Sequence, residues 1–284
     1  MEVNIEIAKS LFEKNKYKEA IDTCNKILAI NPSSINAFKL IAQSFLALNN
    51  INNARLYLKK ALNIKPDNYE IIKDIGNTYQ AVGDVNTAKD YYRKAIAINS
   101  SYAPALTNLG SLELIQGNKQ EALSLLIKAT KSEPQLAAAW SNLANGYIQK
   151  GQLKEAEMAT RKAIELNPHL TNAYLNLGTI LKDLGNLKEA EIATRKAIEL
   201  NSNSADAFLN LGTILKDLGN LKESQIATHK AIELNPNLTN AYLNLGIILN
   251  DLGKLKEAEL ATRKAIELNP HLTNAYLNLG IILK

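Results

Sequence analysis

Six of the seven prolines in this 284-residue chain recur at intervals of 34 residues or multiples of 34. They are Pro32, Pro66, Pro134, Pro168, Pro236 and Pro270, and serine stands at the two places where the series lacks proline. A fixed period of this length, without insertion or deletion, is typical of a repeat array in which each unit packs on its neighbours. The chain is therefore expected to form a stack of small units and not a globule with one core.

If proline is counted as position 32, the period defines eight full repeats and the beginning of a ninth. We expect one continuous array over residues 1–284. Its predicted repeats are 1–34, 35–68, 69–102, 103–136, 137–170, 171–204, 205–238 and 239–272, with a partial repeat at 273–284.

Position 15 holds only glycine or asparagine in all eight full repeats. Both residues tolerate the left-handed backbone conformation that ends a helix. We therefore predict a first helix over roughly positions 2–14 of each repeat. A second helix should begin near position 17 and end before positions 31–32, because the residue before proline is disfavoured in a helix. Each repeat is then an antiparallel helical hairpin, and the fold class is all-α.

Several other positions recur together at the same period. Positions 7–8 are mostly Leu-Gly or Leu-Ala, alanine predominates at positions 20 and 27, and position 4 is large in repeats 5–8, as Trp140, Tyr174, Phe208 and Tyr242. This pattern resembles the tetratricopeptide-repeat motif. The resemblance implies a right-handed α-α superhelix with a concave groove, lined mainly by the first helices, that binds proteins or peptides. One departure is position 24 of the same repeats, where threonine replaces the usual aromatic residue, as Thr160, Thr194, Thr228 and Thr262.

Asparagine stands at position 6 of six consecutive repeats, as Asn108, Asn142, Asn176, Asn210, Asn244 and Asn278. Asparagine is a mediocre helix former, so helix propensity does not explain the series. A carboxamide carries both a donor and an acceptor and can make a paired contact with one peptide unit. The series therefore predicts a ladder that follows the backbone of an extended polypeptide. The alternative is that these side chains brace or cap a neighbouring helix.

Positions 2, 6, 9 and 13 share one face of the first helix. In repeats 6–8 they form a polar stripe, which we take as the candidate binding surface. Besides the ladder, its members are Asn172, Thr179, Asp183, Asp206, Thr213, Asp217, Asn240 and Asp251.

The asparagine series also resembles the superhelical repeats of O-linked N-acetylglucosamine transferase, in which such residues grip the substrate backbone. This resemblance suggests a second function, the non-catalytic recognition arm of a larger glycosyl- or sulfotransferase. A third candidate, capture of a chaperone tail's C-terminal carboxylate, is matched at Lys73, Asn77 and Asn108 but lacks the basic pair at Ala138 and Asn142.

The composition argues against other classes. Cys24 is the only cysteine, the histidines have no metal-ligand spacing, and no catalytic or phosphate-binding motif occurs. Of the net charge of +5, residues 1–136 contribute +4 and residues 137–272 contribute none, a distribution that does not favour nucleic-acid binding. We expect a cytoplasmic, non-enzymatic protein without cofactor, metal or membrane contact. The final segment should also expose an apolar face at Tyr276, Leu279 and Ile281, through which copies could associate end to end.

Overall fold

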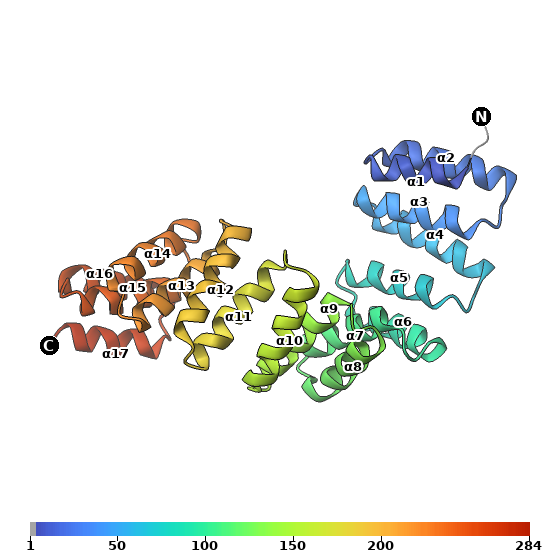
Figure 1. Cartoon of the computed structure of the whole chain (residues 1–284). Helices are drawn as coiled ribbons and strands as arrows, with labels where there is room; N and C mark the ends of the chain where they lie inside the picture. The colour runs from blue at the N-terminus through green and yellow to red at the C-terminus, as the bar shows by residue number, and fades with distance from the viewer. Residues whose placement is uncertain (1–3) are drawn as a thin grey trace. The chain divides into compact units, whose positions relative to one another are not determined.

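The computed structural model describes residues 4–284 as seventeen α-helices without a strand (Figure 1). The helices pair into successive helix-turn-helix repeats, as expected for a tetratricopeptide-repeat solenoid. The predicted first repeat begins at residue 1, and its first three residues lie outside the described part. The chain divides into two compact bodies, which we call the N-terminal body (Met1–Pro134) and the C-terminal body (Gln135–Lys284).

In the N-terminal body, four hairpins follow one another. Their helices are α1 (Ile5–Glu13), α2 (Tyr17–Ile30), α3 (Ile35–Ala47), α4 (Ile51–Ile64), α5 (Tyr69–Gln80), α6 (Val85–Ile98), α7 (Ala103–Ile115) and α8 (Lys119–Ser132).

Four more hairpins and a single helix make up the C-terminal body. Its helices are α9 (Ala137–Gln149), α10 (Leu153–Leu166), α11 (Thr171–Asp183), α12 (Leu187–Leu200), α13 (Ala205–Asp217), α14 (Leu221–Leu234), α15 (Thr239–Asp251), α16 (Leu255–Leu268) and α17 (Thr273–Ile282).

The turn inside each hairpin is made by the residue at position 15. Asn15 and Asn49 have φ angles of 59° and 58°, and the six glycines at this position have φ between 71° and 83°. The chain then closes the helix end with a backbone bond of the Schellman type, as from Asn186 N to Leu181 O at 2.8 Å. The prediction that position 15 ends the first helix in a left-handed conformation is confirmed.

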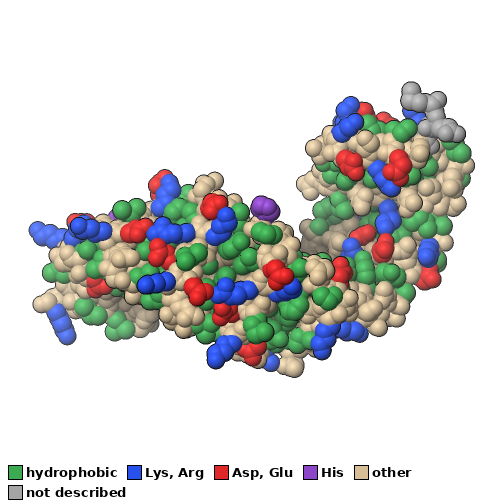
Figure 2. Space-filling view, in the orientation of Figure 1, with side chains coloured by type: hydrophobic (Ala, Val, Ile, Leu, Met, Phe, Trp, Pro, Cys, Tyr) green, Lys and Arg blue, Asp and Glu red, His purple; other side chains and the backbone are tan. Residues whose placement is uncertain are grey.

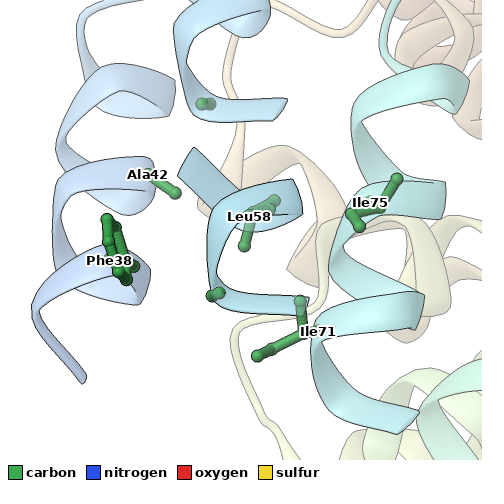
Figure 3. Close-up of a cluster of buried hydrophobic side chains, with 7 residues drawn as sticks. Phe38, Ala42, Leu58, Ile71 and Ile75 are labelled. Carbon is green, nitrogen blue, oxygen red and sulfur yellow. The ribbon is translucent and has the colours of Figure 1, made fainter. Parts of the chain in front are cut away.

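Hydrophobic burial is distributed along each stack in small clusters. One cluster takes Phe38 and Ala42 from α3, Leu58 from α4, and Ile71 and Ile75 from α5 (Figure 3). Because three successive helices contribute, neither hairpin could bury these side chains alone. This is the energetic basis of a repeat stack.

Position 24 of each second helix packs against position 8 of the first helix in the same hairpin. A β-carbon added to Gly76 would lie 2.7 Å from Tyr92 Cε1, and one added to Gly110 would lie 2.7 Å from Leu126 Cγ. Such contacts are too short for carbon atoms. Glycine at position 8 therefore lets the two helices of a hairpin approach closely.

The N-terminal body also holds a buried charge cluster between its last two hairpins. The Glu113 side chain is fully buried and lies 2.7 Å from Lys89 Nζ and 3.1 Å from Arg93 Nη2. Its second oxygen accepts a 2.7 Å hydrogen bond from Asn118 Nδ2. The carboxylate is thus paired and hydrogen-bonded, as a buried charge must be.

Candidate functional site

The C-terminal body contains a hollow of about 520 Å³ along the first helices of three successive repeats, α11, α13 and α15. It brings together seven residues of the predicted stripe, namely Asn176, Thr179, Asp206, Asn210, Thr213, Asn240 and Asn244. Three leucines and Ile247 complete the lining. We call this surface the inner groove, and it is the candidate site.

The asparagines at position 6 brace the stack. Asn278 Nδ2 donates to Thr262 Oγ1 at 2.9 Å, and Asn244 Nδ2 donates to Thr228 Oγ1 at 3.4 Å. Each bond reaches back to position 24 of the preceding repeat. Asn244 and Asn278 are only 7% exposed. Both residues thus make contacts of the bracing kind.

Other ladder asparagines reach position 9 of the preceding repeat. Asn176 Nδ2 donates to Asn145 Oδ1 at 2.8 Å. In the N-terminal body, Asn108 Nδ2 donates to Asn77 Oδ1 at the same distance. Asn210 uses both kinds of partner, with Nδ2 at 3.2 Å from Thr179 Oγ1 and 3.4 Å from Thr194 Oγ1. Hydrogen bonds of this kind link consecutive first helices within each body.

The threonine hydroxyls fix which way the Asn210 carboxamide faces. Thr194 donates its only hydroxyl hydrogen to Ala190 O at 2.8 Å, and Thr179 donates to Leu175 O at 3.1 Å. Both oxygens can then only accept, so the asparagine must turn its NH₂ group toward them. Its two N–H groups are thereby used, and Oδ1 is the group left for a ligand. The sequence led us to expect that each asparagine would both donate to and accept from a ligand peptide unit. At Asn210 only the acceptor, Oδ1, is free to do so.

The same orientation holds at Asn244. Thr228 donates its hydrogen to Ser224 O at 2.8 Å, so Asn244 donates to Thr228. Among residues 4–284, no buried side-chain nitrogen or oxygen lacks a hydrogen-bond partner. Since no donor in the described part of the chain bonds to Asn244 Oδ1, that oxygen lies at the surface of the inner groove, which Asn244 lines.

The remaining predicted site residues do not line the inner groove. Asn172 is exposed in the first turn of α11, and Asn142 is partly buried on α9. The acidic residues at position 13 are exposed in the last turns of their helices, as Asp183, Asp217 and Asp251. The first two of these three carboxylates lie 2.9 and 3.2 Å from the neighbouring Lys182 and Lys216 Nζ atoms.

The apolar residues that line the groove were not predicted from the sequence. Leu175, Leu209 and Leu243 stand at position 5 of three successive repeats and line the hollow, each partly buried. Position 5 follows position 2 by three residues and precedes position 9 by four, so it belongs to the same helical face. That spacing was the signal that could have identified them.

The charges on the outer surface of the second helices neutralise one another. Arg161, Arg195 and Arg263 each donate through Nε at 2.8 Å to the glutamate four residues earlier. Arg161 also reaches Glu189 of the next repeat at 2.7 Å. On the face shown in Figure 2, basic and acidic side chains are interspersed and no single-sign patch dominates.

An exposed apolar stripe runs along this outer surface at position 22 of repeats 5–8. Its members are Met158, Ile192, Ile226 and Leu260, each 69–74% exposed. On α17, Tyr276, Leu277 and Ile281 are also at least half exposed. End-to-end association through that helix stays a prediction.

Within residues 4–284, no cluster of three potential metal ligands occurs, and no helix has the length and hydrophobicity of a membrane span. The three residues of the predicted carboxylate-binding half-site are engaged internally. Lys73 Nζ pairs with Asp74 at 2.5 Å, while Asn77 Oδ1 accepts from Asn108 and lies 2.8 Å from the Tyr92 hydroxyl.

Two protein-family models match this chain. The model of the Cilia and flagella-associated protein 70 C-terminal domain matches residues 68–276, and a tetratricopeptide-repeat model matches residues 2–34 and 37–68. The chain belongs to this tetratricopeptide-repeat family. No curated protein has significant similarity to the sequence.

Several solved structures resemble this repeat protein in fold. A chain of the APC/C hetero-tetramer Cut9-Hcn1 is 18% identical with a TM-score of 0.70; the match covers 98% of the present chain and 55% of that chain. Pseudomonas aeruginosa pilF is 20% identical with a TM-score of 0.67, over 73% and 94% of the two chains. YrrB, described as a TPR protein with an unusual peptide-binding site, is 27% identical with a TM-score of 0.57, over 66% and 96%.

Proposed function

We propose that the chain is a protein-interaction scaffold and that the inner groove holds an extended polypeptide segment. The observation that carries the proposal is the direction of the carboxamides. Asn210 and Asn244 turn their NH₂ groups into the stack, so their oxygens are left to accept hydrogen bonds from a ligand. Peptide backbone N–H groups are suitable donors and are present whatever the sequence of the ligand.

The inner groove also offers apolar surface for ligand side chains. Leu209 lies between Leu175 and Leu243 on adjacent first helices, with the polar side chains of positions 2, 6 and 9 around them. Binding sites commonly combine an apolar lining with a few polar groups that fix orientation. The description of YrrB as a peptide-binding TPR protein is consistent with this proposal.

The expected affinity is modest. Hydrogen bonds accepted by the carboxamide oxygens of Asn176, Asn210 and Asn244, each contributing about 0.5–1.5 kcal/mol net, would supply about 1.5–4.5 kcal/mol of binding free energy. Ordering a flexible peptide costs several kcal/mol. Binding in the micromolar range or weaker is therefore expected unless the leucine surface adds to it.

The test compares two triple variants of the full chain against peptides selected from a random extended library. Asn176→Ala, Asn210→Ala and Asn244→Ala together should weaken binding about tenfold or more. The matched control is Met158→Ala, Ile192→Ala and Ile226→Ala, which alters three exposed residues on the outer surface. Fluorescence anisotropy gives the affinities, and circular dichroism checks that each variant remains folded. Equal affinities for both variants would reject the groove as the binding site.

A recognition arm of a larger glycosyl- or sulfotransferase is the alternative, and its support is the position-6 series that resembles O-linked N-acetylglucosamine transferase. In that case the array would still bind polypeptide in the inner groove, without catalysing the reaction itself. We also propose a cytoplasmic setting, supported by the single, buried and unpaired Cys24. Cell fractionation with a specific antibody would test that location.

A further inference from the structure

Asp206 is the only charged residue that lines the inner groove. It is exposed on the first turn of α13, and no basic residue within residues 4–284 forms an ion pair with it. A carboxylate in the first turn also stabilises the helix through its interaction with the helix dipole. The equivalent positions in the neighbouring repeats are Asn172 and Asn240, so the negative charge is specific to the middle repeat of the groove.

The lysines of α11 and α13 form no ion pair with this carboxylate. Lys182 and Lys216 each pair with the aspartate that follows them in sequence, at 2.9 and 3.2 Å. The groove therefore presents one unpaired carboxylate beside the oxygens of its asparagines. A partner that supplies a cation and N–H donors complements it, and an acidic partner is repelled.

The spacing of the leucines constrains the conformation of the partner. Helices α11, α13 and α15 are successive neighbours, and packed helices lie about 8–10 Å apart. A polyproline-II segment rises about 3.1 Å per residue and turns once in three residues, so its side chains repeat about every 9 Å on one side. Every third side chain of such a segment would therefore meet the next leucine in the series Leu175, Leu209 and Leu243.

We propose that the inner groove selects an extended, polyproline-II-like segment that has an aliphatic side chain at every third residue and a lysine or arginine beside Asp206. The residues facing the asparagine oxygens are not proline, because proline has no N–H to donate. This inference rests on the proposed function of the groove and specifies the class of polypeptide it takes.

Three fluorescein-labelled peptides of about ten residues, about 31 Å in this conformation, test the inference against the full chain. The first has leucine at every third position and one central lysine. The second has the same composition with leucine at every second position, and the third replaces the lysine with glutamate. We expect the first peptide to bind at least about tenfold more tightly than the second, since a misplaced leucine loses its contact.

Substitution of Asp206 tests the role of its charge. Asp206→Asn reproduces the residue of the neighbouring repeats, so the fold should tolerate it, and it should weaken binding of the lysine peptide about twofold to fivefold. Asp206→Lys should invert the preference between the lysine and glutamate peptides. The matched control is Asp251→Asn, an exposed aspartate on α15 outside the groove, which should change neither affinity.

The outcomes separate this inference from the proposed function. If both leucine spacings bind equally and the asparagine triple variant weakens both, the spacing is overturned while the groove remains the binding site. If the lysine and glutamate peptides keep their order in Asp206→Lys, the role of Asp206 is overturned. If the asparagine triple variant binds every peptide as well as the unmodified chain does, the proposed function itself fails.

Discussion

Asn278 and Thr262 form a buried hydrogen bond across two successive repeats. Asn278 Nδ2 lies 2.9 Å from Thr262 Oγ1, and Thr262 is fully buried. Gly246 makes room for both, because a β-carbon there would overlap Thr262 Oγ1 and lie 3.1 Å from Asn278 Nδ2. The departure from the repeat motif at position 24 thus supplies the acceptor for the next repeat's asparagine.

The N-terminal body uses a different arrangement at the same positions. Tyr92 occupies position 24 there, and its hydroxyl lies 2.8 Å from Asn77 Oδ1 and 2.6 Å from Gln80 Oε1. Asn108 then donates to Asn77 instead of to position 24. Glycine and threonine at positions 8 and 24 of repeats 6–8 therefore act as one set with the asparagine at position 6 of the next repeat.

Adding a methyl group to the glycine of this set should destabilise the protein. In Gly246→Ala the new β-carbon would overlap Thr262 Oγ1, and overpacking of this kind costs about 1–3 kcal/mol. Urea denaturation monitored by circular dichroism measures the loss. The matched control is Gly280→Ala, at the same repeat position on α17, where a β-carbon meets nothing within 4 Å. It should be neutral or stabilising by up to about 1 kcal/mol, and a loss equal to that of Gly246→Ala would contradict the packing argument.

Removing the threonine hydroxyl tests the hydrogen bond separately from the packing. Thr228→Val keeps the shape of the side chain but leaves the buried NH₂ group of Asn244 without its acceptor, which costs about 1–3 kcal/mol. Thr160→Val is the control, because Asn176 donates to Asn145 and forms no bond to Thr160. Its free energy of unfolding should fall by less. Similar losses in the two variants would show that the asparagine bond adds little.

Protonation of Glu113 should weaken the N-terminal body in acid. Burial raises the pKa of this carboxyl, but hydrogen bonds from Lys89 and Asn118 and the charges of Lys89 and Arg93 outweigh it and hold the pKa below its usual value of 4.5. A pKa lowered by folding means that the stabilisation is present above the unfolded pKa and is lost as pH falls through the folded value. Glu113→Gln should be less stable by about 3–5 kcal/mol at pH 7, because Lys89 would remain buried without a carboxylate to pair with, held only by its 2.6 Å bond to the neutral Gln116 side chain.

The difference in the free energy of unfolding between the unmodified chain and Glu113→Gln should then shrink below about pH 4.5. Urea denaturation from pH 7 to pH 3 measures it. Glu121→Gln serves as the control, since Glu121 is half exposed and only 3.6 Å from Arg93, and its effect should stay under about 1 kcal/mol at every pH. A difference for Glu113→Gln that does not vary with pH would contradict the assignment.

Cys24 should be chemically inert in the folded protein. It is fully buried in the N-terminal body, and burial raises the pKa of its thiol to about 11. The thiolate is the reactive form, so little of it is present at pH 8. Ellman's reagent should therefore react slowly with the native chain and rapidly in urea. Rapid modification of the native protein would show that α1 and α2 open readily.

The sequence predicted the helices and turns well because their signals are local. Glycine or asparagine at position 15 ends the first helix by its own backbone preference, and the structure places all eight in the left-handed region. The contacts of the asparagines were harder to predict. Whether Asn210 faces a ligand, Thr179 or Thr194 depends on distances between residues 16 and 31 positions apart. Helical periodicity within one repeat does not contain those distances. The groove leucines were not predicted because the expected binding surface was defined by its polar residues, and position 5 is apolar in those repeats.

The bonds from asparagine to threonine connect only consecutive repeats, and they occur at the same positions at three successive junctions, those of Asn210 with Thr194, Asn244 with Thr228 and Asn278 with Thr262. Excising residues 205–238 as a block would therefore bring Asn244 opposite Thr194, the equivalent of its present partner Thr228. Any repeat that carries this threonine can therefore be followed by any repeat that carries this asparagine. Such an array can lengthen or shorten by whole copies through unequal recombination without creating an unsatisfied amide, and each event would change the length of polypeptide that the groove can read.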